Sequence, residues 1–325
     1  MILIVGGAGY IGSHINKELN AEGYETLVLD NLSSGRKELL KWGKFVEGGL
    51  DDEKLLDKIF TENKIDAVFH FAALKAAGES MIEPEKYYLN NVGATLKLLE
   101  AMRRNKVNKF VFSSSAAVYG QPEYIPIDEK HPKNPINTYG MTKLMVENIL
   151  ADYARSYGFL SVCLRYFNAV GADIEADVGE WPGSSANLVP IALDVAIGRR
   201  DKLTIFGTDY PTEDGTCVRD YIHVSDLAVA HIKALEFLNK NNKSEVFNLG
   251  NGKGFSVMEV VKMTKEVTGI DYSVVIGERR EGDPPVLIAD SKKAMEVLGW
   301  TPKFNSLKTI VETAWVWHQK AVKML

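Results

Sequence analysis

The chain has 325 residues, enough for roughly two domains at ~100–200 residues each. Its residues are 46% hydrophobic and 25% charged, as in ordinary soluble globular proteins, and the net charge of −5 gives no reason to expect a nucleic-acid or acidic-membrane partner. Two cysteines, Cys163 and Cys217, cannot build a disulfide framework or a zinc cluster, so we expect no metal site.

The first predicted strand lies at the start of the chain. Ile2–Val5 follows Met1 at once, and no basic or apolar segment before it resembles a removable signal. No apolar run approaches the ~18–20 residues that span a bilayer. We therefore expect a cytoplasmic protein with no membrane partner.

Short apolar runs alternate with amphipathic stretches through the first half of the chain. The predicted strands are 2–5, 24–29, 65–71, 109–113 and 160–166. The predicted helices lie near 10–21, 51–63, 84–105 and 139–157. This order predicts an α/β fold, a doubly wound parallel (Rossmann) sheet covered by helices.

A glycine-rich turn, Gly6–Gly12, joins the first strand to the first helix. In this context glycines let the backbone approach a pyrophosphate, whose charge the helix N-terminus stabilises. Asp30 ends the next strand, where its carboxylate can bind ribose hydroxyls and would repel a 2′-phosphate, which favours NAD over NADP. The alternatives are a glycine turn without a ligand and an Asp30-Asn31 pair that only caps a turn.

Serines and a tyrosine–lysine pair carry the predicted chemistry. Ser113–Ser115 ends a strand at the carboxyl edge of the sheet, and the proline-rich loop 120–138 leads to Tyr139. Lys143 lies one helical turn after Tyr139, so its ammonium can stabilise the phenolate and make the phenol a base. Strand-end serines are also common caps, but the tyrosine and lysine favour a catalytic Ser115. No acid stands at 116–117, which argues against coupled loss of water.

The second half of the chain does not continue the regular alternation of strands and helices. A loop at 169–187 precedes helix-like 188–199, strand-like 202–206 and helix-like 225–240, and Val246–Leu249 looks like a strand that rejoins the first sheet. We therefore predict a dinucleotide-binding domain of residues 1–168 with 222–250, and a smaller mixed α/β substrate domain of 169–221 and 251–325. Arg219 and Arg280 each stand near an acid; they either clamp a diphosphate or form ion pairs.

These motifs resemble the UDP-glucose 4-epimerase family of extended short-chain dehydrogenases/reductases, and the similarity runs essentially end to end. It rests on Gly6–His14, Phe71–Ala76, Ser113–Gly120, Leu164–Asn168 and, most specifically, Asp209–Thr216. The resemblance implies NAD as cofactor, a UDP-hexose as substrate, and a homodimer formed through helices 84–105 and 139–157. It also implies an isomerase that interconverts UDP-glucose and UDP-galactose through a 4-keto sugar.

The resemblance assigns roles to individual residues. Ser115 and Tyr139 transfer the proton of the sugar 4-hydroxyl, and Lys143 binds the nicotinamide ribose and lowers the tyrosine pKa. The implied cofactor contacts are Gly6, Gly9, Tyr10, Ile11, Gly12, Asp30, Asn31, Leu50, Phe71, Ala72, Ala73, Leu74, Lys75, Asn90, Ser113, Tyr139, Lys143 and Tyr166. The implied substrate contacts are Lys75, Ser115, Tyr139, Asn168, Asn187, Leu188, Thr204, Phe206, Arg219, Tyr221, Arg280, Asp283 and Leu287.

Two positions depart from the family pattern. Gly49 stands where the family often has an acid beside the adenine, so that contact is either lost or supplied by Asp51. Leu287 stands where a large tyrosine tends to exclude N-acetylated sugars and a small residue admits them. Leucine is intermediate, so we expect some tolerance of UDP-N-acetylglucosamine.

Three rival interpretations stay open at this point. They are a 4-epimerase of UDP-uronates, a 4,6-dehydratase, and a non-catalytic protein that binds a dinucleotide. The missing acid at 116–117 disfavours the dehydratase, and the neutral Leu287 offers a uronate no partner. Intact Ser115, Tyr139 and Lys143 count against the non-catalytic protein.

Overall fold

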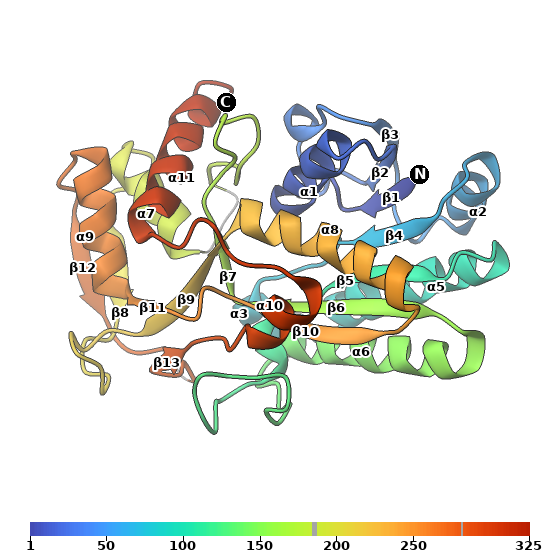
Figure 1. Cartoon of the computed structure of the whole chain (residues 1–325). Coiled ribbons are helices and arrows are strands. Elements are labelled where there is room, and N and C mark those ends of the chain that lie inside the picture. The colour runs from blue at the N-terminus through green and yellow to red at the C-terminus, as the bar shows by residue number, and fades with distance from the viewer. Residues whose placement is uncertain (184–186, 281) are drawn as a thin grey trace.

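A seven-stranded parallel sheet forms the centre of the computed structural model, which describes residues 1–183, 187–280 and 282–325 (Figure 1). The strand order is β10-β6-β5-β4-β1-β2-β3, so the chain reverses direction across the sheet between β1 and β4. Every neighbouring pair is parallel. The bounds are β1 Ile2–Val5, β2 Thr26–Asp30, β3 Lys44–Glu47, β4 Ala67–His70, β5 Lys109–Ser113, β6 Leu160–Tyr166 and β10 Glu245–Leu249. The predicted doubly wound fold is confirmed.

Helices cover both faces of this sheet. On one face, α1 (Tyr10–Ala21) and α8 (Val224–Asn241) share a core with the strands, and Ile15 and Leu19 of α1 are fully buried in it. On the other face lie α2 (Glu53–Glu62), α5 (Ala94–Arg104) and α6 (Thr138–Tyr157). Cys163 is buried in this second core, in agreement with a packing role.

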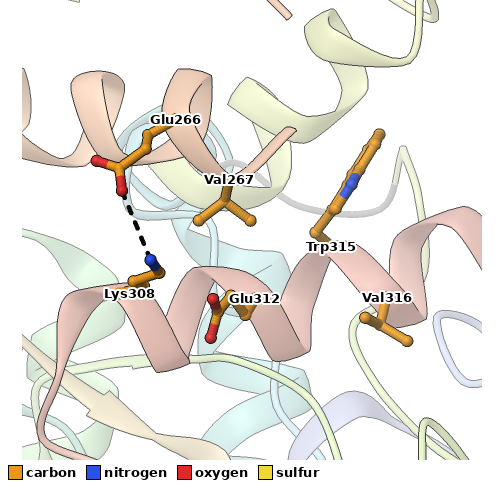
Figure 2. Close-up of a pocket in the computed structure, with 6 residues that line it drawn as sticks. All are labelled: Glu266, Val267, Lys308, Glu312, Trp315 and Val316. Atoms are coloured by element: carbon orange, nitrogen blue, oxygen red, sulfur yellow. Dashed lines mark ion pairs between the residues drawn. The ribbon is translucent and has the colours of Figure 1, made fainter. Parts of the chain in front are cut away.

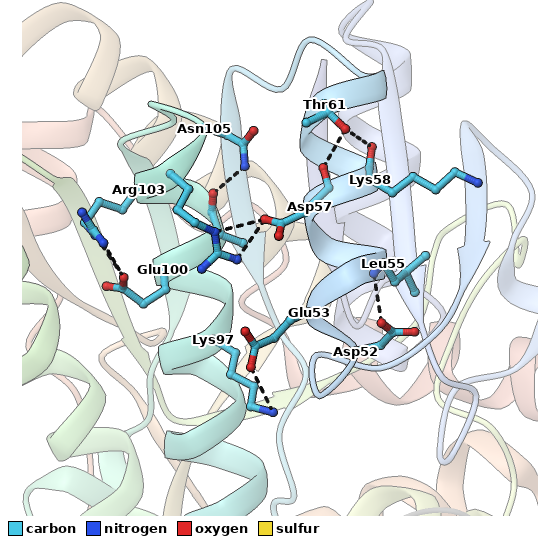
Figure 3. A network of polar contacts seen from close by, with 12 residues as sticks. Asp52, Glu53, Leu55, Asp57, Lys58, Thr61, Lys97, Glu100, Arg103 and Asn105 are labelled. Atoms are coloured by element: carbon cyan, nitrogen blue, oxygen red, sulfur yellow. Dashed lines mark hydrogen bonds and ion pairs between the residues drawn. The ribbon is translucent and has the colours of Figure 1, made fainter.

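The outer surface where α2 meets α5 is polar (Figure 3). Asp52 caps α2 by accepting the N–H of Leu55 at 3.0 Å. Arg104 of α5 donates to Asp57 of α2 at 2.9 Å, and Lys97 lies 3.6 Å from Glu53. These exposed pairs join two helices whose buried faces already pack together.

One predicted element in the first half needs correction, and two elements were not predicted. The predicted helix 84–105 is in three parts: α4 (Pro84–Tyr87), a π-helix at Tyr88–Gly93 and α5. A short helix, α3 (Ala77–Ile82), precedes them and was not predicted. The edge strand β3 was also missed, because three of its four residues are exposed and it has no apolar pattern.

Smaller elements form the second part of the chain. The helix α7 (Leu188–Ala196) and the strand β8 (Leu203–Phe206) confirm two predictions. Unpredicted short strands surround β9 (Val218–His223), which pairs with β7, β11 and β13, while β12 pairs with β8. Residues 184–186 of the predicted loop lie outside the described residues. The remaining bounds are β7 Asn168–Val170, β11 Gly254–Ser256, α9 Val257–Thr268, β12 Val274–Gly277, β13 Val286–Leu287, α10 Lys292–Leu298 and α11 Leu307–Val322.

The chain crosses between the two parts more than once. As expected, β10 pairs with β6 at the edge of the main sheet. In addition, Ala294, Leu298 and Trp300 pack in the core of α1 and α8, although they belong to the predicted second domain. The domain boundaries stay a prediction. Among the described residues, no helix combines the length and apolar character needed to cross a membrane.

Candidate active site

Glycines of the turn between β1 and α1 stand where a side chain has no room. Gly6 has a φ of +82°, and a Cβ there would lie 2.5 Å from the backbone nitrogen of Ala72. A Cβ at Gly12 would overlap the carbonyl oxygen of Gly6. Gly9 caps α1 without a side-chain hydrogen bond, and no acidic residue stands in the first turn. The helix N-terminus therefore presents backbone N–H groups to an anion, and this fits a dinucleotide diphosphate.

Asp30 is held at the carboxyl end of β2. Its carboxylate accepts the N–H of Ala8 at 3.0 Å and that of Leu32 at 2.8 Å. Burial raises the pKa of this carboxyl, and the two hydrogen bonds oppose the rise. Asn31 accepts the N–H of Ser33, so the turn-capping interpretation of the pair is realised as well.

Gly35 is a residue of this region that the sequence reasoning missed. A Cβ at Gly35 would lie 2.8 Å from Asp30 Oδ1 and 2.8 Å from Ala8 Cβ. The next residue, Arg36, donates its N–H to the carbonyl oxygen of Ala8 at 2.9 Å. Gly35 thus lets the loop after β2 close over the Asp30 carboxylate. The only available signal was a glycine shortly after the strand.

Leu50 and the residues after β4 complete the surroundings of the glycine turn. Leu50 is buried, and the Asp51 carboxylate fills the space beside Gly49. Phe71 and Ala72 both donate N–H groups to the carbonyl oxygen of Val5. The predicted cofactor segments of β1, β2 and β4 therefore meet at the carboxyl edge of the sheet.

Tyr139, Lys143 and Ser115 come together as predicted. Asn137 caps α6 by accepting the N–H of Gly140 at 2.8 Å, which sets Tyr139 in the first turn. Lys143 Nζ lies 5.9 Å from the centre of the Tyr139 ring and donates to the carbonyl oxygen of Ser113 at 2.7 Å. The Ser115 side chain is hydrogen-bonded to Tyr139.

Burial shifts both titrating groups toward their neutral forms in the chain alone. It raises the pKa of the Tyr139 phenol, which the hydrogen bond from Ser115 opposes. It lowers the pKa of Lys143 to about 7, which the nearby negative charge of Glu147 opposes. A base at Tyr139 near neutrality therefore needs a positive charge beyond these side chains.

Tyr166 and an asparagine pair lie beside the predicted catalytic residues. The Tyr166 hydroxyl shares a 2.5 Å hydrogen bond with Ser113 Oγ. The predicted contact Asn90 is exposed and donates to Asn91 Oδ1 at 2.9 Å. The buried Asn91 binds both backbone groups of Leu74 and the Thr142 hydroxyl. Asn91, which the sequence reasoning missed, thus ties the loop after β4 to α6.

Lys75 reaches from the loop after β4 toward the second part of the chain. Its ammonium lies 3.3 Å from Glu180 Oε1, and its side chain is 58% exposed while that of Glu180 is 6% exposed. Lys75 was predicted to lie near the cofactor, but its pairing with the buried Glu180 was not predicted. Glu180 follows a glycine, Gly179, in a loop that had no recognised motif.

The predicted substrate residues gather on β9 and its neighbours. The pairing of β9 with β13 sets Arg219 opposite Leu287, and the pairing with β7 sets Tyr221 opposite Asn168. Arg219 donates to Asp283 at 2.5 Å, so the ion-pair alternative is realised between two predicted contacts.

The other predicted substrate residues lie around β8. The Arg280 guanidinium is 4.0 Å from the centre of the Phe206 ring. Thr204 is on the same strand, and Leu188 at the start of α7 packs against a core that contains Leu203 and Ile205. Asn187 directly precedes α7.

A cavity of about 350 Å³ lies elsewhere, between α9 and α11 (Figure 2). Its lining is Glu266, Val267, Lys308, Glu312, Trp315 and Val316. None of these residues belongs to the predicted site. Lys308 and Glu266 are 3.7 Å apart across it and form an ion pair.

Comparison with known proteins agrees with this geometry. The model of the NAD dependent epimerase/dehydratase family matches residues 2–250. A UDP-glucose 4-epimerase of Halalkalibacterium halodurans is 51% identical over 319 residues, covering 98% of this chain and 96% of that protein.

Solved structures are similar over the whole length. The UDP-glucose 4-epimerase of Bifidobacterium longum in complex with NAD+ and UDP has a TM-score of 0.94 and 40% identity, and the alignment covers 100% of this chain and 99% of that one. The UDP-Glc/GlcNAc 4-epimerase of Campylobacter jejuni has a TM-score of 0.87 and 44% identity, with coverage of 98% and 99%. The resemblance inferred from the sequence motifs is confirmed.

Proposed function

The chain belongs to the NAD-dependent epimerase/dehydratase family, and we propose that it interconverts UDP-glucose and UDP-galactose through a 4-keto sugar. It is an isomerase whose cofactor is NAD. The observation that carries the proposal is the Tyr139 hydroxyl hydrogen-bonded to Ser115, with the Lys143 ammonium on the same face of α6.

Proton transfer is the proposed task of the chain's own side chains. Tyr139 takes the proton of the sugar 4-hydroxyl, directly or through Ser115, and later returns it. Bringing a phenol pKa from about 10 to near 7 requires roughly 4 kcal/mol of differential stabilisation. Lys143 supplies part of this charge stabilisation.

NAD, when bound, supplies a hydride acceptor at C4 of the hexose and a positive charge beside the phenol. The uncapped N-terminus of α1 fits its diphosphate, and Asp30 fits its adenosine ribose. Lys143 and Tyr166 are the proposed contacts at the nicotinamide end. Asp51 is the candidate for the adenine contact that Gly49 lacks.

The UDP part of the substrate must be held firmly while the hexose turns over. Arg219 and Arg280 are the proposed diphosphate contacts, and Asn168, Leu188, Phe206 and Tyr221 lie on elements around them. The Arg219–Asp283 ion pair supports a guanidinium already oriented for this task. Rotation of the 4-keto sugar about its diphosphate link would then expose the second face of C4 for return of the hydride.

A dehydratase is disfavoured by the residues after Ser115. Ala116–Val118 form a short 3₁₀ turn that Ser115 caps, and no acid occupies it. Loss of water from C6 after oxidation at C4 needs such a proton donor. The same alanines suit a reaction that only moves a hydride out and back.

The proposal extends to the size of the sugar. Leu287 lies opposite Arg219 in the β9–β13 pair, and a leucine leaves more room than a tyrosine for a 2-acetamido group. A relative of 44% identity is a UDP-Glc/GlcNAc 4-epimerase. We therefore expect slower but measurable conversion of UDP-N-acetylgalactosamine.

The proposal also includes a homodimer. Exposed apolar side chains gather on α3 and the π-helix, where Met81, Ile82 and Leu89 are 60%, 82% and 65% exposed. A patch of this kind is typical of an interface. Light scattering after gel filtration should give twice the chain mass of 36.1 kDa, and Leu89→Lys should shift it toward the monomer. A cytoplasmic location stays a prediction.

Proton NMR of the purified protein tests the proposed activity. UDP-galactose is expected to convert to UDP-glucose without added NAD, since the cofactor is regenerated in each turnover. UDP-N-acetylgalactosamine is then tested in the same way. No conversion of either sugar, with or without added NAD, would overturn the proposal.

A further inference from the structure

A chain of buried polar side chains adjoins the Tyr139–Lys143 pair. Glu147 lies one helical turn after Lys143 on α6 and is 7% exposed. Its carboxylate accepts from Ser114 Oγ at 2.6 Å, from Arg165 Nε at 2.9 Å and from Arg165 Nη2 at 2.5 Å. The carboxylate is therefore held in one orientation by Arg165 of β6 and by Ser114, which directly follows β5.

The same chain continues away from α6. Arg165 donates through Nη1 to the Tyr119 hydroxyl at 2.9 Å, and Tyr119 donates to Asn248 Oδ1 at 2.6 Å. Asn248 donates in turn to the carbonyl oxygen of Ile127 at 2.9 Å. Each side chain in this series has its hydrogen-bond partners, as a buried network requires.

Stability alone does not account for the Glu147–Arg165 pair. Two charges taken out of water lose their hydration, and a well-packed apolar pair of similar volume is often as stable or more stable. Glu147 lies one helical turn after Lys143 of the proposed site, and its buried pair with Arg165 of β6 therefore calls for a role in that site.

The surroundings of Lys143 show which charges act on it. The Phe112 ring of β5 lies 4.9 Å from its Nζ, and Tyr139 lies on its own helix. His70 of β4 is neutral because burial lowers its pKa to about 3. Tyr166 of β6 is neutral as well, since burial raises its pKa. Glu147 is thus the neighbour whose negative charge favours the ammonium, and Arg165 pairs with that carboxylate.

We propose that Glu147 is a positioning residue that keeps Lys143 in its ammonium form, and that Arg165 and Ser114 hold the Glu147 carboxylate for this task. The inference rests on the proposed roles of Tyr139 and Lys143, because Glu147 acts through Lys143 and does not touch the sugar. Through Ser114, the same carboxylate also fixes the strand end that presents Ser115.

Glu147→Gln tests the inference in the protein as purified. Loss of the carboxylate leaves Lys143 less often charged, so Tyr139 ionises at higher pH. The acidic limb of kcat/KM for UDP-galactose should move up by about one pH unit, with about tenfold lower kcat/KM on that limb. A second readout is tyrosinate absorption, taken as the difference between each protein and the same protein with Tyr139→Phe. Its midpoint should move in the same direction.

Two variants separate positioning from folding. Glu147→Asp keeps the charge and should bring the limb back toward that of the unchanged chain. Asp226→Asn is the matched control. Asp226 is also a buried carboxylate, 2% exposed, but it is not on α6 and accepts the N–H groups of Lys303 and Phe304. It should lower the unfolding midpoint without moving either pH readout.

A folded Glu147→Gln protein with unmoved pH readouts overturns the inference while the epimerase proposal stands. If that variant does not fold, Glu147→Leu with Arg165→Leu removes the pair without leaving a buried charge, and unmoved readouts there overturn the inference too. Full activity of Tyr139→Phe would instead overturn the proposed role of Tyr139, and no conversion by the unchanged chain would overturn the proposed function itself.

Discussion

Tyr139 is the residue on which the proposed chemistry depends, and its surroundings explain why a phenol can serve. The Ser115 hydroxyl and the Lys143 ammonium both favour its ionised form, against a burial that disfavours it. Tyr139→Phe keeps the ring and removes the proton acceptor. Turnover of UDP-galactose should fall by about 10²–10⁴-fold, measured by NMR, with an unchanged unfolding midpoint. Activity within a few-fold of the unchanged chain would contradict the assignment.

Gly35 is the residue whose replacement most directly tests the cofactor half of the site. A methyl group at this position would lie 2.8 Å from the Asp30 carboxylate, so Gly35→Ala must displace that carboxylate or its loop. NAD affinity, measured by calorimetry on protein stripped of cofactor, should weaken by about tenfold, which corresponds to ~1.4 kcal/mol.

Gly78→Ala is the matched control for that change. A Cβ at Gly78 would meet no atom within 4 Å, and the residue lies in α3 without a positive φ. It should leave NAD affinity unchanged. Equal NAD affinities of the Gly35→Ala and Gly78→Ala variants would contradict a role of Gly35 in the cofactor site.

The residues that the sequence did not reveal share a property. Gly35, Asn91 and Glu147 act on Asp30, Leu74 and Lys143 from positions that carry no motif. A motif marks the residues predicted to meet the ligand, whereas these three support the predicted residues through contacts formed only on folding. Ser115, Tyr139 and Lys143 were predictable because strand end, loop and helix fix their order along the chain.

At the scale of elements, α2 allows the contribution of a helix cap to the free energy of unfolding to be compared with that of a surface ion pair. Asp52 satisfies an N–H that the helix leaves unpaired, while Asp57 pairs with the exposed Arg104. Asp52→Ala should lower the free energy of unfolding by about 1 kcal/mol, and Asp57→Ala by at most about 0.5 kcal/mol. Urea unfolding measures both, and 0.5 M salt should shrink only the second effect. The reverse order would contradict this interpretation (Figure 3).

Elements were predictable where their hydrophobic pattern is strong. The buried strands β1, β4, β5 and β6 and the amphipathic α1 and α6 were found from apolar runs and spacing. The edge strand β3 and the short strands β7, β11 and β13 were missed, since pairing with distant segments creates them. The π-helix at Tyr88–Gly93 was read as part of one α-helix because its residue types suit either form.

At the scale of the whole molecule, buried histidines make the free energy of unfolding depend on pH. Burial lowers the pKa of His14 and His231 to about 4, and that of His70 and His223 to about 3. Below the ordinary value of about 6.5, the unfolded chain binds protons that the folded chain refuses. Their contribution to stability is therefore complete above about pH 6.5 and is lost as the pH falls.

The expected loss is large. Each of the four histidines lowers the free energy of unfolding by about 1.4 kcal/mol for each pH unit of acidification, once the histidine is protonated in the unfolded chain. Asp220, whose pKa burial raises to about 6, acts in the opposite direction but offsets at most one of them. The urea midpoint should fall steeply between about pH 6.5 and pH 5. A midpoint that is unchanged over this range would contradict the neutral state of these histidines.

The central claim is that oxidation at C4 is reversed within the same turnover, with Tyr139 moving only the hydroxyl proton. UDP-galactose carrying deuterium at C4 tests it directly when the conversion is followed by NMR in ordinary water. The UDP-glucose formed should retain the deuterium at C4, because the atom leaves carbon and returns to it without meeting solvent. Loss of the deuterium to water during conversion would contradict the account, since it would mean that carbon, not oxygen, gives up its proton to the protein.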